Sequence, residues 1–165
     1  MSFTVPEVRA TLVVPAPQGA VWEYIVDLRN APRWMWGVRE VLGPTRHPLR
    51  PGDRIHLRLI AGGRAADSEW TIGDWAPPHR LESEGSALGA RAWLWIECRA
   101  VGPQRTEVAQ RLRYQLPGGP LGRLASHFGI HGVLELQARN SLRALARELR
   151  QAGRTAPADA LPEGR

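Results

Sequence analysis

The sequence contains no lysine, a single cysteine and no long apolar segment. One cysteine, Cys98, excludes an internal disulfide and a zinc site built on several cysteines. No apolar run approaches the roughly 18 residues of a membrane-spanning helix, and the first residues lack the basic and then apolar pattern of a signal peptide. We therefore expect a cytoplasmic protein without a transmembrane segment.

Because lysine is absent, all 22 positive side chains are arginines, against 16 acidic residues. A nucleic-acid-binding protein would gather such cations into a patch with aromatic residues between them. Here they are spread along the chain, and the densest group falls on one side of a predicted helix, where it is expected to face solvent. That group is Arg139, Arg143, Arg147 and Arg150. We therefore expect no nucleic-acid partner.

The length of 165 residues and an apolar fraction of 43% are typical of one globular domain. A chain of this size removes roughly 70% of its unfolded surface from water, so it needs no disulfide or metal to fold. We predict one domain over residues 1–152. Gly153 is a candidate helix C-cap, and residues 153–165, with two prolines and no periodicity, are expected to be disordered.

Hydrophobic periodicity predicts the order of elements along the chain. A strand at residues 5–14 is followed by a helix at 20–28 and a short helix at 33–36. The period then changes to two, and six strands are predicted, at residues 38–42, 54–60, 65–75, 80–84, 91–100 and 106–115. The connections are too short for crossover helices, so the sheet is expected to be antiparallel.

The last predicted element is a long amphipathic helix at residues 121–151. Its inner side falls within an arc of about 120° at 100° per residue. That side consists of His127, Ile130, His131, Leu134, Ala138, Leu142, Leu145 and Leu149. These elements predict an α+β fold in which one curved sheet of seven antiparallel strands wraps around the C-terminal helix.

Several short motifs carry a resemblance to a known family. They are VPAP at residues 14–17, VWEYIVD at 21–27, NAPRW at 30–34, PGD at 51–53 and DWAPPHRL at 74–81. With these motifs the chain resembles the START-like superfamily of helix-grip proteins, also called SRPBCC, and most of all its polyketide cyclase/dehydrase branch. The resemblance covers residues 4–150 and is specific for the fold rather than for an activity.

The resemblance implies an apolar cavity between the sheet and the last helix, which members of the superfamily use for lipids, quinones, polyketides and other hydrophobic molecules. Strand alternation and the inner side of the last helix supply candidate lining residues. They are Trp34, Leu57, Leu59, Leu94, Ile96, Gln110, Leu112, Tyr114, His127, His131 and Leu134. The resemblance also places Trp34 and Trp36 beside the entrance, although Trp34 could instead plug one end of the core.

His127, His131 and Tyr114 are the candidates for acid–base chemistry, because they would bring titratable groups into an apolar site. The alternative is that both histidines lie half exposed near the helix start and bond to loop backbone. Their spacing also suits two metal ligands, but Phe128 stands where a zinc motif needs glutamate. We expect no metal and no cofactor.

Three further residue types have a structural interpretation. Cys98 is expected to be a small buried apolar residue, and Asp27 a helix cap or a partner of a nearby arginine. Alternation puts Trp93 and Trp95 on the convex side of the sheet, flanked by Arg91 and Arg99. These tryptophans either form a partly covered outer face or mediate a homodimer.

The sequence therefore predicts a protein that binds a hydrophobic, aromatic or polycyclic small molecule. One alternative is a polyketide cyclase or dehydratase that uses the same cavity. The other is an accessory protein that binds a partner through its convex face.

Overall fold

The structure is a computed structural model that describes residues 5–61, 63–118 and 120–155. The side chains of residues 61, 120–128 and 155 lie outside this description. The tail predicted for residues 153–165 falls mostly outside it as well. None of the described helices is long and apolar enough to cross a membrane.

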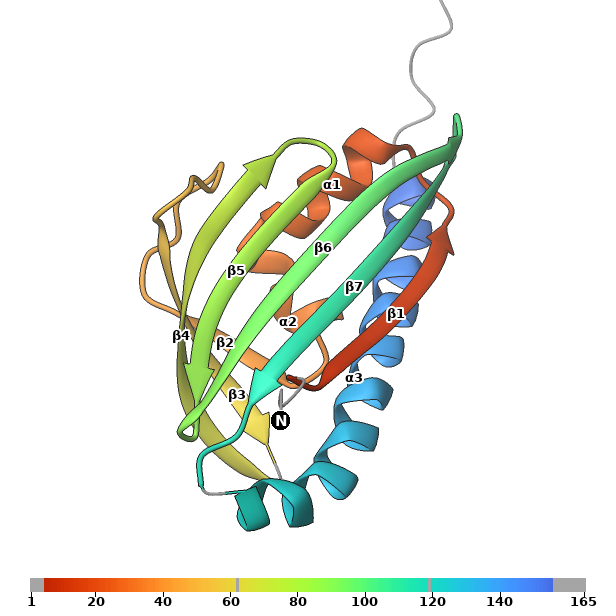
Figure 1. The fold of residues 1–165 in the computed structure, drawn as a ribbon. Helices are drawn as coiled ribbons and strands as arrows, with labels where there is room; N and C mark the ends of the chain where they lie inside the picture. The colour runs from red at the N-terminus through yellow and green to blue at the C-terminus, as the bar shows by residue number, and fades with distance from the viewer. Residues whose placement is uncertain (1–4, 62, 119, 156–165) are drawn as a thin grey trace, which may run out of the picture.

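Seven strands form one antiparallel sheet, and together with the helices it confirms the predicted helix-grip fold (Figure 1). The strands are β1 (Glu7–Val14), β2 (Val38–Leu42), β3 (Arg54–Ala61), β4 (Arg64–Ala76), β5 (Arg80–Ala87), β6 (Ala90–Gly102) and β7 (Arg105–Gln115). Their order in the sheet is β1-β7-β6-β5-β4-β3-β2, so β1 and β2 are the two edges. Every strand boundary lies within three residues of its predicted position.

The short helices differ from the prediction in their boundaries. They are α1 (Gln18–Val26), a 3-10 turn η1 (Leu28–Asn30) and α2 (Ala31–Trp34). The second helix was predicted at residues 33–36, but it begins earlier because Pro32 fits the first turn, where its missing N–H is not needed. Trp36 therefore lies beyond the helix. Asp27 caps η1 by accepting from the backbone N–H of Arg29, as expected.

The C-terminal helix α3 (Pro120–Thr155) is longer than predicted. Gly153 was predicted to end it, but this residue lies inside the last turn and the helix continues to Thr155. A glycine at an exposed helical position costs only about 1 kcal/mol relative to alanine, which a helix of this length tolerates. The C-cap assignment of Gly153 is therefore wrong.

The sheet curves around α3, and all helices lie on its concave side (Figure 1). The second half of α3 is buried there through Ala138, Leu142, Leu145 and Leu149. Near the C-terminus of α3, α1 packs against β6 and β7 and contributes the buried Val21 and Trp22. The core therefore lies between the concave face and the helices, where the amphipathic pattern of α3 predicts it.

Candidate functional site

Strand β7 carries an alternating row of side chains on the concave face. Thr106, Val108, Gln110 and Tyr114 are buried, whereas Leu112 is half-buried. The register with β6 places Gln110 beside Ile96, Leu112 beside Leu94 and Tyr114 beside Ala92. We call the region of Thr106, Val108 and Cys98 the α1 end, and the region of Ala92, Leu112 and Tyr114 the Tyr114 end.

The remaining predicted lining residues lie on the same face or on the helix opposite. Leu57, Leu94 and Ile96 are buried, and Leu59 and Leu134 are half-buried. Leu134 lies in the first half of α3, which covers the Tyr114 end. The structure therefore brings these residues to one side of the sheet, and their role in lining a cavity stays a prediction.

A direct polar contact joins the sheet to α3 at the Tyr114 end. The Tyr114 Oη atom lies 3.2 Å from Nδ1 of His131, and the ring centroids are 6.3 Å apart. Burial raises the pKa of Tyr114, so its hydroxyl keeps its proton at neutral pH. Two of the three acid–base candidates are thus in contact. The third, His127, has its side chain outside the described residues.

The amide of Gln110 is buried in apolar surroundings. Its neighbours across the strands are Ile96 and Ala10, and its Oε1 atom has no hydrogen-bond partner among the described residues. A buried acceptor left unpaired costs about 1 to 3 kcal/mol. A bound molecule that donates a hydrogen bond to Gln110 Oε1 would therefore remove this cost.

Trp70, on β4, is a second unpaired polar group on this face, and the sequence analysis did not identify it. Its Nε1 atom is buried without a partner among the described residues. The alternation of Ser68, Trp70 and Ile72 is the sequence signal that could have shown that Trp70 faces inward. The register of the folded sheet places Gly85, on β5, opposite the tryptophan. A Cβ atom at Gly85 would lie 2.7 Å from Cε2 of Trp70, so the indole packs on the glycine.

These residues form a row across the Tyr114 end. The strand registers connect Tyr114 to Ala92, Ala92 to Gly85 and Gly85 to Trp70. Three strand spacings of about 4.8 Å separate the two aromatic residues by about 14 Å at the backbone. The two residues between them, Ala92 and Gly85, have small side chains or none. This part of the concave face is therefore bordered by an aromatic side chain on each side and has little side-chain volume between them.

Trp34, in α2, is fully buried and belongs to the core, which matches its interpretation as a plug. Its Nε1 atom also lacks a partner among the described residues. Trp36, in contrast, is 53% exposed and lies on the outer side of α3. The position of Trp36 beside a cavity entrance stays a prediction.

The α1 end has a different polar chemistry. The Thr106 hydroxyl donates to the Ala16 carbonyl at 2.8 Å, and Gln18 Nε2 donates to the Cys98 carbonyl at 2.8 Å. Burial raises the pKa of the Cys98 thiol to about 12, so it remains a neutral packing group. The expectation that Cys98 is buried is confirmed.

The convex face carries Trp93 and Trp95, both half-buried. Arg91 lies 5.1 Å from the Trp93 ring centroid, and Arg111 lies 4.5 Å from that of Trp95. Arg99 was also expected to flank them, but it pairs with Glu107 at 2.8 Å. Stacked arginines thus cover part of both rings, and a homodimer through this face stays a prediction.

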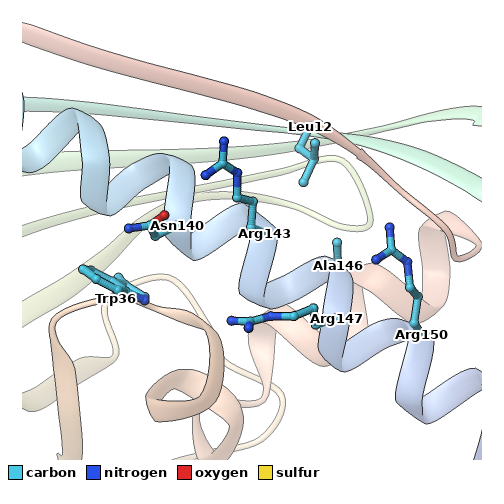
Figure 2. Close-up of a pocket in the computed structure, with 7 residues that line it drawn as sticks. All are labelled: Leu12, Trp36, Asn140, Arg143, Ala146, Arg147 and Arg150. Carbon is cyan, nitrogen blue, oxygen red and sulfur yellow. The ribbon is translucent and has the colours of Figure 1, made fainter.

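Two grooves lie along α3 where it passes the edge strand β1. The larger, of about 510 Å³, is shown in Figure 2. Its lining residues are Leu12, Trp36, Asn140, Arg143, Ala146, Arg147 and Arg150. The smaller, of about 290 Å³, is lined by Arg9, Ala10, Thr11, Leu12, Arg139, Leu142 and Arg143. None of the predicted cavity residues whose side chains the structure describes lines either groove. Among the side chains that the structure describes, no group of three or more acids, histidines and cysteines could hold a metal.

Solved structures share this fold at low sequence identity. The Zhui aromatase/cyclase from Streptomyces sp. R1128 superposes with a TM-score of 0.78 at 15% identity, covering 94% of this chain and all of that one (100%). A protein from Thermus thermophilus gives 0.71 at 20% identity, covering 89% and 99%. A START superfamily protein from Mycobacterium smegmatis gives 0.63 at 16% identity, covering 88% and 98%.

At such identities these structures establish the fold alone. No curated protein matches the chain. The family model described as polyketide cyclase / dehydrase and lipid transport matches residues 5–150, which include every strand of the sheet and most of α3. The chain therefore belongs to the polyketide cyclase / dehydrase and lipid transport family.

Proposed function

We propose that this protein binds a hydrophobic, polycyclic aromatic molecule between the Tyr114 end of the sheet and the first half of α3. The observation that carries the proposal is the pair of unpaired buried polar atoms, Gln110 Oε1 and Trp70 Nε1. One is an acceptor and the other a donor, and both lie on the concave face. A planar molecule with hydroxyl and carbonyl groups on its rim complements both.

The surroundings of these two atoms favour an aromatic ligand. Leu59, Leu112 and Leu134 are only half-buried, so apolar surface remains to be covered. The row from Tyr114 to Trp70 spans about 14 Å, which is comparable to the length of a few fused rings. A few placed polar groups in an apolar lining are typical of small-molecule sites.

Binding is tested with a neutral apolar fluorophore, 1-N-phenylnaphthylamine, by equilibrium dialysis. We expect about one molecule per chain, and we expect Leu134→Trp to weaken binding by at least about tenfold, because the larger side chain fills the space between helix and sheet. Leu136→Trp is the matched control, since Leu136 is on the same helix but 52% exposed. Unchanged binding by a folded Leu134→Trp protein would contradict the proposal.

A second candidate function is a cyclase or dehydratase reaction at the same place. The contact between Tyr114 Oη and His131 Nδ1 favours it, since enolisation and loss of water both need proton transfer near neutral pH. In this reaction His131 takes a proton from carbon, and the Tyr114 hydroxyl donates a hydrogen bond to the carbonyl oxygen that becomes negative.

The two candidates differ in what His131→Asn changes. For an enzyme, turnover of a synthetic poly-β-ketone thioester falls by roughly 10²- to 10⁴-fold with little change in binding. For a binding protein, only affinity falls, by about 1 to 3 kcal/mol. His56→Asn is the control, because His56 is an exposed histidine on β3. No change in either quantity would remove His131 from the site.

A further inference from the structure

The outer side of α3 carries a regular row of residues that the folded domain does not use. Their positions advance by alternating steps of three and four. The row is Val133, Leu136, Asn140, Arg143, Arg147, Arg150 and Arg154. At 100° per residue they fall within an arc of about 100°. Steps of three and four are the spacing by which one helix packs along another. We call this row the α3 seam.

The apolar end of the α3 seam is unusually exposed. Val133 is 56% exposed and Leu136 is 52% exposed. Trp36, which is also exposed, lies against the next turn of α3, because its backbone N–H donates to Ser141 Oγ and the residue lines the groove together with Asn140. Several large exposed apolar side chains in one part of the surface are typical of an interaction site.

The basic end of the α3 seam lacks partners of opposite charge. On the sheet, arginines lie against carboxylates, as Arg58 does with Asp67 at 3.0 Å and Arg113 with Glu7 at 2.6 Å. Arg143, Arg147 and Arg150 form no ion pair among the described residues, and none of the described residues that line their groove is a carboxylate. Figure 2 shows Arg143 and Arg147 leaving α3 on opposite sides of its axis, with the groove between Leu12 and Trp36.

We propose that the α3 seam is a docking site for an amphipathic, acidic helix of a partner protein. The partner helix places apolar side chains on Val133, Leu136 and Trp36. Its carboxylates, spaced by three and four residues, face Arg143, Arg147 and Arg150 over a rise of about 10.5 Å. Arginine pairs with such carboxylates through two parallel hydrogen bonds, which adds geometric specificity.

Other occupants fit the α3 seam less well. A second copy of this chain in parallel would set arginine against arginine, and an antiparallel copy would set arginines against Val133 and Leu136. A lipid surface supplies negative charge, but its charges have no fixed spacing along a helix. It would therefore not explain the regular spacing of three and four residues. Arg143 borders the edge strand β1, and no residue of the proposed ligand site belongs to the α3 seam. The role of the seam is therefore independent of that site.

The test uses the full chain and two labelled peptides of about 20 residues, long enough to form a helix. The first carries leucines at one end and glutamates at the other, on one helical face. The second has the same composition with the glutamates distributed around the helix. Fluorescence anisotropy at low salt measures binding. We expect the patterned peptide to bind at least about tenfold more tightly than the scrambled one.

Two charge-matched variants locate the binding surface. Replacing Arg143, Arg147 and Arg150 by Gln should weaken binding of the patterned peptide by roughly 10- to 100-fold. The control replaces Arg39, Arg64 and Arg105, which are exposed on the sheet and form no ion pair among the described residues, by Gln. It should change binding by less than about threefold. Trp36→Ala should weaken binding without a change in melting temperature, because the side chain is exposed.

Three results would overturn the proposal. Equal losses in both triple variants would mean that only net charge matters. Equal binding of the two peptides would mean that the spacing is not recognised. Binding of phosphatidylglycerol vesicles through the same three arginines, with no binding of the patterned peptide, would make the α3 seam a lipid-binding surface instead.

Discussion

The two ends of the concave face differ in how their buried polar groups are satisfied. At the α1 end, Thr106 and Gln18 both donate to backbone carbonyls at 2.8 Å. Away from that end, Gln110 Oε1, midway along β7, and Trp70 Nε1, in the row that begins at Tyr114, have no partner among the described residues. Because unpaired buried groups reduce stability, the difference indicates that the two ends serve different purposes.

Helix α3 shows the same division along its length. In its second half Leu142, Leu145 and Leu149 are fully covered, whereas Ile130 and Leu134 in the first half are half-buried. One helix therefore closes the core at its C-terminal half and covers the candidate site at the other. We therefore expect the larger contribution to stability from the α1 end, and the proposed binding site lies at the Tyr114 end.

The largest expected effect compares two leucines of α3. Leu145 has no exposed surface, so Leu145→Ala leaves a cavity and should lower the free energy of unfolding by about 2 to 5 kcal/mol. Leu134→Ala should cost only about 1 kcal/mol, because its side chain is already half exposed and water fills the space. Urea denaturation of both variants measures the difference. Equal losses would show that the first half of α3 is as much part of the core as the second.

The next effect concerns Gly85, which lies opposite Trp70 in the row at the Tyr114 end. In Gly85→Ala the new methyl group would lie 2.7 Å from the Glu69 carbonyl oxygen and closer still to the Trp70 ring, so the indole must move. We expect a loss of about 1 to 3 kcal/mol in the free energy of unfolding. Gly73→Ala, on β4, is the control, because its Cβ would meet nothing closer than 3.6 Å. A Gly85→Ala protein of unchanged stability would show that the Trp70 ring is free to leave this position.

The fold was predictable from the sequence because its signals are local. The alternation of apolar and polar residues predicted the strands, and turn residues predicted the short antiparallel connections. The apolar side of residues 138–149 predicted the helix that the sheet surrounds. The errors lie at helix ends. Proline interrupts a helix but also fits its first turn, where Pro32 lies. A long helix tolerates an exposed glycine such as Gly153 in its interior.

The candidate site was only partly predictable. Alternation showed that Gln110 and Tyr114 face inward, but the approach of Tyr114 Oη to His131 depends on how far the sheet curves toward α3. Trp70 was not predicted as a site residue, because it meets Gly85 only through the register of β4 and β5. The α3 arginines were interpreted as a solvated face. Arg139 pairs with Glu135, and that Arg143, Arg147 and Arg150 form no ion pair among the described residues is a property of the folded surface.

A smaller effect contrasts one polar group from each end. Thr106→Val removes the donor to the Ala16 carbonyl in a fully buried position and should cost about 1 to 2 kcal/mol in the free energy of unfolding. Gln110→Leu removes an amide whose oxygen is unpaired, so it should leave stability unchanged or raise it slightly. The same variant should weaken binding of a hydroxylated aromatic ligand. A Gln110→Leu protein that is destabilised as much as Thr106→Val would show that Gln110 has a structural role.

The smallest effect is the ionisation of the two tyrosines. Burial, with the hydrogen bond to Glu148 adding to it, raises the pKa of Tyr24 to about 12, and burial raises the pKa of Tyr114. In the unfolded chain both titrate near pH 10. A raised pKa means that the fold favours the neutral hydroxyl, so this contribution to stability is complete below about pH 10 and is lost as the pH rises through the folded values. Tyrosinate absorbance should therefore rise later in the native protein than in urea. In Tyr24→Phe the remaining signal belongs to Tyr114, and a midpoint at or below that of the unfolded chain would mean that water reaches its hydroxyl freely and that the Tyr114 end is not a buried site.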